Sequence, residues 1–274
     1  MKVETTVERN KSRKNADRQS WIEKIPTKGW LLLSLTVAVI FWSILSVIPS
    51  TARSFPNIIY VVESIGLMMS RGVFWQDISS SMISVLFGFL IGFVLSLPVA
   101  ILMAWYRPVQ YIIEPWIQFI RNIPPLAYVP LVVISFGVGR TPQIIVITIA
   151  TFLTMSITIY QGIKNIDPTL IKAARVLGAK DKDIFFKVIG PASLPFIMTA
   201  IRLGTAIALT SLIAAESTGA SAGLGMRIRA LNNTFESSPM LLYIIVIGVI
   251  GLIIEKLIKI LERRLTGWQE KREQ

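Results

Sequence analysis

Few side chains in this sequence could carry out chemistry. The sequence contains no histidine and no cysteine, which excludes thiol chemistry, acid–base catalysis by histidine, and metal sites built from these residues. Two carboxylates, Glu114 and Glu216, lie in apolar segments, but no second carboxylate stands at a spacing typical of a catalytic pair. The residue types therefore indicate neither an enzyme nor a metal site, and they require no cofactor.

Polar side chains inside apolar segments indicate a path across a membrane instead. Glu114 and Arg121 lie about two helical turns apart, on the helix face that also carries Gln118. Two interpretations remain open. The two charges could pair and only hold the helix near the inner interface, or the face could line a polar path, because ionisable groups at this depth face the bundle interior or water. The candidate residues for such a path are Glu114, Gln118, Arg121, Asn122, Arg202 and Glu216.

The composition shows which kind of element must position these residues. Of the 274 residues, 53% are hydrophobic and 16% are charged, and the mean hydropathy is +0.63. A soluble protein of this length cannot bury so much apolar surface, so the sequence predicts a polytopic helical membrane protein. The formal net charge is +12. Its cations gather beside the apolar segments, which is typical of membrane topology and does not indicate a nucleic-acid partner.

Six apolar segments predict an all-α bundle of six transmembrane helices in a lipid bilayer. Pro124-Pro125 breaks the third segment, and Gly88-x-x-x-Gly92 in the second predicts a close helix–helix contact. The expected organisation is a basic cytoplasmic tail 1–28, a membrane domain 29–261 and a cytoplasmic tail 262–274. The spans are expected at about 29–47, 78–104, 109–138, 142–160, 191–217 and 240–261.

Residues 164–190 form the one long basic stretch between two apolar segments, and they are expected to be a structured loop. Asp167 is placed to cap a short helix that starts with a proline, and Gly178 is placed to end that helix in the left-handed conformation. Asp181 is expected to cap a second short helix, which Gly190-Pro191 would stop before a third helix begins. A loop of this kind is suited to docking a partner.

The distribution of cations predicts the orientation of the chain. Six spans place both tails and the loop 164–190 on one side of the membrane, and these are the most basic parts of the sequence. Because cytoplasmic loops carry an excess of lysine and arginine, both termini and this loop are expected to be cytoplasmic. The segment 217–238 is expected to be a loop of small residues on the opposite side.

The loop 164–190 resembles the permease subunits of bacterial ABC importers. Their signature is Glu-Ala-Ala, three residues, Gly, nine residues, then Ile-x-Leu-Pro. Two positions depart from this signature. Lys172 occupies the position of the glutamate, and Gly190 occupies the position of the leucine. The positions in register are Ala173, Ala174, Gly178, Val188 and Pro191.

Further patterns resemble one branch of that family, the permeases for nitrate, taurine, sulfonates and bicarbonate. The segment Arg121-Asn122-Ile123-Pro124, followed by Pro130-Leu131 and Phe136-Gly137, is one of them. The second is Ala215-Glu216 with Gly223-Leu224-Gly225. These patterns narrow the subfamily without fixing the substrate.

The resemblance implies a fold, a location and a set of partners. It implies a type I ABC importer permease in the bacterial inner (plasma) membrane, paired with a second permease copy as a homodimer. It also implies two ATPase subunits and a substrate-binding protein outside the cytoplasm; the sequence itself holds no Gly-x-x-x-x-Gly-Lys-Ser/Thr motif for ATP. The residues expected to couple to the ATPase are Asp167, Lys172, Ala173, Ala174, Gly178, Ala179, Asp181, Val188 and Pro191.

The expected function is therefore a permease for a small solute, and an anion such as sulfonate, taurine, nitrate or bicarbonate is favoured. Permeases for a pyrimidine vitamin precursor or a flavin carry similar motifs and are the alternative within the family. A secondary transporter that works without ATP is the alternative from another class, although no internal repeat is evident. A membrane enzyme would need a catalytic constellation, and a channel would leave the docking loop unexplained.

Overall fold

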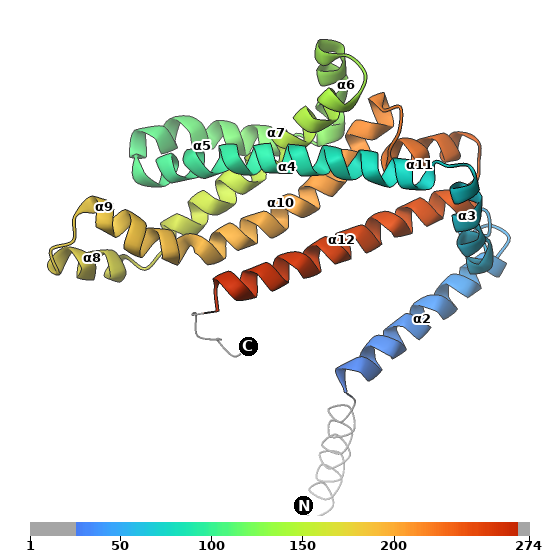
Figure 1. Ribbon diagram of the computed structural model, residues 1–274, viewed down its shortest axis with the longest axis horizontal. Helices are drawn as coiled ribbons and strands as arrows, with labels where there is room; N and C mark the ends of the chain where they lie inside the picture. The colour runs from blue at the N-terminus through green and yellow to red at the C-terminus, as the bar shows by residue number, and fades with distance from the viewer. Residues whose placement is uncertain (1–25, 268–274) are drawn as a thin grey trace, which may run out of the picture. The chain divides into compact units, whose positions relative to one another are not determined.

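The computed structural model describes residues 26–267, which form helices joined by turns, with no strand in this range (Figure 1). The expected all-α fold is confirmed. The chain divides into two compact units, residues 1–61 and 62–274. The expectations for residues 1–25 and 268–274, which belong to the two basic tails, lie outside the described residues.

The first unit contains α2 (Thr27–Val47), which includes the expected first span. The indole N–H of Trp42 donates to the Pro56 carbonyl oxygen at 2.9 Å, and the Trp42 ring meets the Phe55 ring edge to face. These contacts hold the turn that follows α2 against its last part. Most apolar side chains of α2 are exposed, as expected of a helix that meets lipid or another membrane helix.

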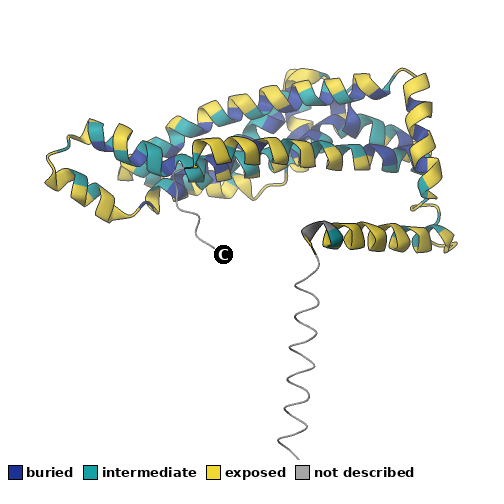
Figure 2. Ribbon diagram, turned by 60° about the horizontal axis from the view of Figure 1, so that its bottom comes forward, coloured by how far each residue is buried: buried dark blue, intermediate teal, exposed yellow. Residues whose placement is uncertain are grey.

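Three long helices form the centre of the second unit: α4 (Phe74–Trp105), α7 (Arg140–Lys164) and α10 (Gly190–Gly219). Both α4 and α10 pack on α7, and Figure 2 shows the buried residues concentrated within this bundle. Gly88 and Gly92 face α7, where a Cβ atom on Gly88 would lie 2.7 Å from Ile147. The Gly-x-x-x-Gly prediction of a close helix contact is confirmed.

The third expected span consists of two helices at a large angle. α5 (Arg107–Arg121) and α6 (Pro125–Phe136) are bent by 99° around residues 122–124. Pro124 and Pro125 explain the break, because neither can donate the N–H that would continue the α5 hydrogen bonds. Residues 109–138 are therefore a broken span or a re-entrant segment.

The entry into α10 differs from the expectation. α9 (Asp181–Asp183), the π-helix η1 (Ile184–Ile189) and α10 follow one another without a break. Gly190 has helical dihedral angles and donates its N–H to the Phe185 carbonyl oxygen, five residues back. The predicted stop at Gly190-Pro191 is wrong, because the π turn continues directly into α10. Pro191 lies at the start of α10, where its missing backbone N–H costs no helix hydrogen bond.

The remaining helices are α3 (Ile58–Ser70), α8 (Pro168–Val176), α11 (Leu224–Asn233) and α12 (Ser237–Leu265). α11 lies inside the segment 217–238, where only a loop was expected. Within the described residues, five helices are long and apolar enough to cross a membrane, or six if α5 and α6 count as one span.

Candidate functional site

The N-terminal cap of α8 agrees with the sequence pattern. Asp167 accepts the backbone N–H of Thr169 at 2.8 Å, and Pro168 occupies the first helical position. This hydrogen bond to the carboxylate lowers the pKa of Asp167 below its ordinary value. The start of α8 is therefore set by local sequence.

The C-terminal end of α8 is a Schellman motif centred on Gly178. The Gly178 N–H donates to Arg175 O, and the Ala179 N–H donates to Ala174 O, each at 3.0 Å. Gly178 has φ +79°, a conformation that costs little only for glycine. The chain therefore reverses direction sharply between α8 and α9.

A small apolar core fixes α8 against η1. Its buried residues are Ile166, Ile184 and Ile189, and Ala174 packs against them. Val188 is half-buried, whereas Ala173 and Lys172 are exposed. Asp181 is the first residue of α9 and not its cap, because the capping position is Lys180, which offers no side-chain hydrogen bond; Asp181 pairs instead with Arg175 at 3.5 Å.

The outer face of α8 is unusually apolar for a polar segment. Val176 and Leu177 have 88% and 87% of their surface exposed, and Leu170 is also exposed. Figure 2 shows this end of the molecule largely exposed. A rigid helix with exposed aliphatic side chains has the properties of a protein-docking surface.

The polar residues of α5 form a row and do not form an ion pair. The Glu114 carboxylate accepts hydrogen bonds from Gln110 and Gln118, each at 2.9 Å, and Asn122 donates to Gln118 O. Among the described residues no ion pair joins Glu114 to Arg121. The structure therefore does not contain the Glu114–Arg121 pair of the first interpretation.

The two path candidates on α10 are not brought together with those on α5 or with each other. Arg202 forms an ion pair with Glu262 of α12. Glu216 lies 14 positions further along the helix, roughly 21 Å away at 1.5 Å per residue. Each is part of a separate interaction.

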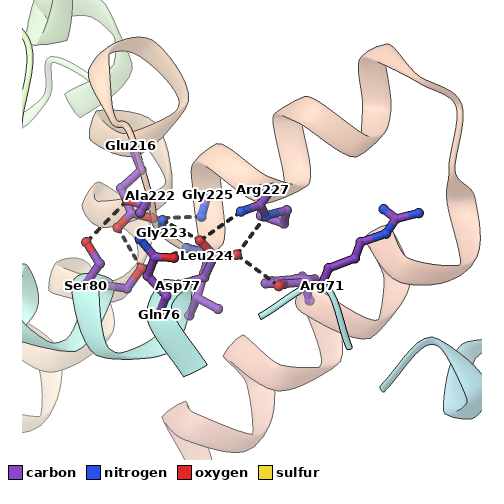
Figure 3. A network of polar contacts seen from close by, with 12 residues as sticks. Arg71, Gln76, Asp77, Ser80, Glu216, Ala222, Gly223, Leu224, Gly225 and Arg227 are labelled. Carbon is purple, nitrogen blue, oxygen red and sulfur yellow. Dashed lines mark hydrogen bonds and ion pairs between the residues drawn. The ribbon is translucent and has the colours of Figure 1, made fainter. Parts of the chain in front are cut away.

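Glu216 belongs to a buried network at the end of α10 that lies far from α8 (Figure 3). Its carboxylate accepts the Ser81 hydroxyl at 2.6 Å and the Gly225 N–H at 2.7 Å. The Ser81 oxygen in turn accepts the Leu224 N–H at 2.8 Å. A buried carboxylate at the start of α11 thus satisfies helix N–H groups that have no partner within the helix.

Asp77 completes this network, and its role was not predicted from the sequence. Its carboxylate, which is fully buried, accepts the Gly223 N–H at 3.0 Å, Arg227 Nε at 2.7 Å and the Tyr243 hydroxyl at 2.9 Å. The hydrogen bond that Arg227 donates to the Asp77 carboxylate raises the pKa of the Arg227 guanidinium. The sequence signal that could have identified Asp77 is the position of an acidic residue at the start of a long apolar segment, close to Ser81.

The sequence also matches a known family, in agreement with this geometry. Residues 96–267 match the family model described as "binding-protein-dependent transport system inner membrane component". The chain belongs to this family. It is a membrane-spanning permease of ABC transporters, and the predicted resemblance is confirmed.

The relatives of the permease include proteins of the expected branch. It is 40% identical over 243 residues to a probable ABC transporter permease protein of Brucella abortus (strain 2308), covering 89% of this chain and 92% of that one. It is 34% identical over 194 residues to the taurine transport system permease protein TauC of Escherichia coli (strain K12), with 71% and 70% covered. It is 28% identical to the bicarbonate transport system permease protein CmpB of Synechococcus elongatus, with 92% and 96% covered.

Solved structures agree in fold. An inward-facing form of the MetNI methionine ABC transporter matches with a TM-score of 0.60 at 21% identity, over 74% of this chain and 99% of that one. An amino acid ABC transporter crystallised with histidines matches with a TM-score of 0.62 at 20% identity, over 73% and 97%. These matches support the bundle architecture of the permease.

Proposed function

We propose that the permease carries a small anion, such as a sulfonate, taurine, nitrate or bicarbonate, inward through an ABC importer. The names of the relatives support this substrate class, since they include taurine and bicarbonate systems. The motifs around Arg121 and Glu216 support the same branch. The family also implies ATPase subunits and a substrate-binding protein as partners.

The observation that carries the inference of ATP-driven coupling is the continuous helical rod from Asp181 to Gly219. α8 packs on the start of this rod through the core around Ile184. A force applied to the exposed Val176 and Leu177 side chains would therefore reach α10 directly, without a flexible hinge between them. In the proposal, one ATPase subunit receives α8, and its closure on ATP tilts α10.

A second permease copy would complete the path. α5 has three distinct faces: a buried face including Ile117, an exposed apolar face including Trp116, and the polar row around Glu114. Two copies in a homodimer would place their polar rows opposite each other and their apolar faces toward lipid. Arg121 is then the cation best placed to attract an anion, because Arg202 is already compensated by Glu262.

The test of coupling is the permease co-purified with the ATPase encoded beside it and reconstituted in proteoliposomes. We expect stable association and ATP hydrolysis that responds to the loaded binding protein, and we expect Gly178→Asp to lose this response. Gly248→Ala is the matched control, since a Cβ atom added at Gly248 would meet nothing within 4 Å and this residue belongs to α12. Absence of any association with an ATPase would refute the proposal and favour an ATP-independent transporter.

The substrate class has its own test. Uptake of taurine, an alkanesulfonate, nitrate and bicarbonate is measured with the cognate binding protein, for the parent and for Arg121→Gln. We expect uptake of the cognate anion to fall several-fold in the variant while ATPase association is kept. Uptake of a pyrimidine or a flavin, unaffected by Arg121→Gln, would establish the other substrate group instead.

A further inference from the structure

The last turn of α7 carries a lysine that a buried tyrosine holds in place. Lys164 Nζ donates to the Tyr160 hydroxyl at 3.1 Å and lies 5.5 Å from the centre of the Tyr160 ring. Tyr160 has 1% of its surface exposed, so this contact anchors the lysine to the core of the bundle. Lys164 itself is exposed, and within the described residues it forms no ion pair. Because an ammonium has three N–H donors and this bond uses one, the charge is oriented without being neutralised.

The packing of α5 on α7 brings the Glu114 carboxylate near this lysine (Figure 1). Ile117 of α5 and Tyr160 of α7 are buried in one apolar cluster. Glu114 lies one helical turn from Ile117, and Lys164 lies one turn from Tyr160. The Lys164 ammonium interacts electrostatically with Glu114 across this contact. Two side chains of opposite charge therefore lie near each other without forming a direct ion pair.

The Glu114 charge is an obstacle to the transport of an anion along the polar row of α5. The only hydrogen-bond donors that the described residues offer to its carboxylate are the neutral amides of Gln110 and Gln118, each at 2.9 Å. Arg121 lies seven positions further along α5, about 10 Å away at 1.5 Å per residue. An anion that moves from Arg121 toward the start of α5 would approach a like charge, which repels it. A cation beside Glu114 removes this barrier.

We propose that Lys164 determines the charge selectivity of the inner end of the path, because its ammonium offsets the Glu114 carboxylate and lets a small anion leave. The proposal rests on the importer function argued above. Lys164 is a specificity-determining residue in this proposal, and Tyr160 is the residue that positions it.

The anchor on Tyr160 explains why the two charges do not simply pair. A direct Lys164–Glu114 ion pair would bridge α5 and α7 and leave neither charge for a solute. The hydrogen bond and the ring contact with Tyr160 hold the ammonium on α7 instead. The interaction with Glu114 then acts through space, and the remaining N–H donors of Lys164 can meet the passing anion.

The test compares Lys164→Gln with the double variant Lys164→Gln, Glu114→Gln in the permease–ATPase complex in proteoliposomes. ATP-driven uptake is measured with the loaded binding protein for taurine, an alkanesulfonate, nitrate and bicarbonate. We expect Lys164→Gln to lower the maximal uptake rate of the cognate anion by about tenfold. The binding-protein concentration that gives half of this rate should stay unchanged, because the other side of the permease is not altered. The double variant should recover most of the rate, because it also removes the charge that Lys164 offsets.

Three further measurements separate the charge from other effects. Lys164→Arg keeps the positive charge and should keep most of the uptake. Lys256→Gln removes another exposed lysine, on α12, and should leave uptake unchanged. Because Ile166, two residues after Lys164, belongs to the core that fixes α8, ATP hydrolysis is measured in parallel and should be unchanged in every variant. Higher salt on the cytoplasmic side should reduce the defect of Lys164→Gln, since salt screens exposed charges.

The outcomes distinguish this proposal from the importer function. Full uptake in Lys164→Gln, in a complex whose parent transports one of the anions, overturns the role of Lys164 and leaves the importer function standing. A loss that Glu114→Gln does not recover also overturns it. A lower melting temperature in that case identifies Lys164 as a cation that only stabilises the C-terminal end of α7. Uptake of a pyrimidine or a flavin, and of none of the anions, would refute the proposed substrate class and this proposal together.

Discussion

At the scale of single residues, the attachment of α11 to α4 and α10 depends on two buried carboxylates. Asp77 and Glu216 accept three consecutive backbone N–H groups, two directly and one through the Ser81 hydroxyl. Gly223, with φ +140°, permits this approach, since a Cβ atom there would overlap the Glu216 carboxylate. The structure thus gives Glu216, considered from sequence as a path residue, a role in holding α11.

The first prediction concerns the ion pair within this network. Asp77→Asn keeps the shape of the side chain but leaves the Arg227 guanidinium without its anion. Removing one partner of a buried pair is strongly destabilising, so the free energy of unfolding should fall by about 3 kcal/mol. Denaturant unfolding in detergent measures this loss. Ser79→Ala, at an exposed position two residues away, is the control, and an equal loss there would contradict the prediction.

The second prediction concerns the cap of α8 and its dependence on pH. The pKa of Asp167 is lowered in the folded helix by its hydrogen bond from Thr169. The stabilisation by the carboxylate is therefore complete above the pKa of the unfolded chain and is lost as pH falls through the lower, folded pKa.

Amide hydrogen exchange in α8 measures this effect. In the parent, protection at Thr169 and Leu170 should decrease only on acidification below the ordinary aspartate range. Asp167→Asn keeps an acceptor oxygen and should show protection that does not change with pH, whereas Asp167→Ala should be less protected throughout. Identical pH profiles for the parent and Asp167→Asn would show that the carboxylate does not act as the cap.

At the scale of elements, packing of α4 on α7 depends on two glycines. The third prediction is that Gly92→Ala separates these helices, because a methyl group there would overlap the Thr151 hydroxyl and crowd the α7 backbone. Overpacking of this kind costs about 1–3 kcal/mol, which thermal unfolding in detergent would detect. Gly248→Ala in α12, where nothing lies within 4 Å, is the matched control and should be neutral.

The elements also show what could be predicted from sequence. The caps of α8 were predictable because Asp167, Pro168 and Gly178 act through their own backbone neighbours. The continuous helix through Gly190-Pro191 was not, because a π turn depends on packing around Ile184 and Ile189 as well as on local residue types. Asp77 was missed for a related reason: its partners lie about 150 residues away along the chain.

At the scale of the whole molecule, α10 and the turns before it connect α8 to the buried carboxylate network. The rod Asp181–Gly219 has 39 residues, which corresponds to about 58 Å. Helix α8 packs at its start, and Glu216 near its other end holds the backbone of α11. A tilt of α10 would therefore act on α8 and on α11 together, as the proposed coupling requires.

The proposed coupling requires α8 and α11 to face opposite sides of the membrane, which is the last prediction. Because the sequence contains no cysteine, single cysteines can be labelled without background. Ser221→Cys, in the exposed turn before α11, should react with a membrane-impermeant maleimide in intact spheroplasts. Lys182→Cys, in the exposed start of α9, should react only after the membrane is permeabilised. The positive-inside distribution of cations predicts this orientation. Labelling of both cysteines from the same side would contradict it, because α8 and α11 would then not face opposite sides of the membrane. The reverse labelling pattern would place α8 away from a cytoplasmic ATPase and contradict the proposed coupling.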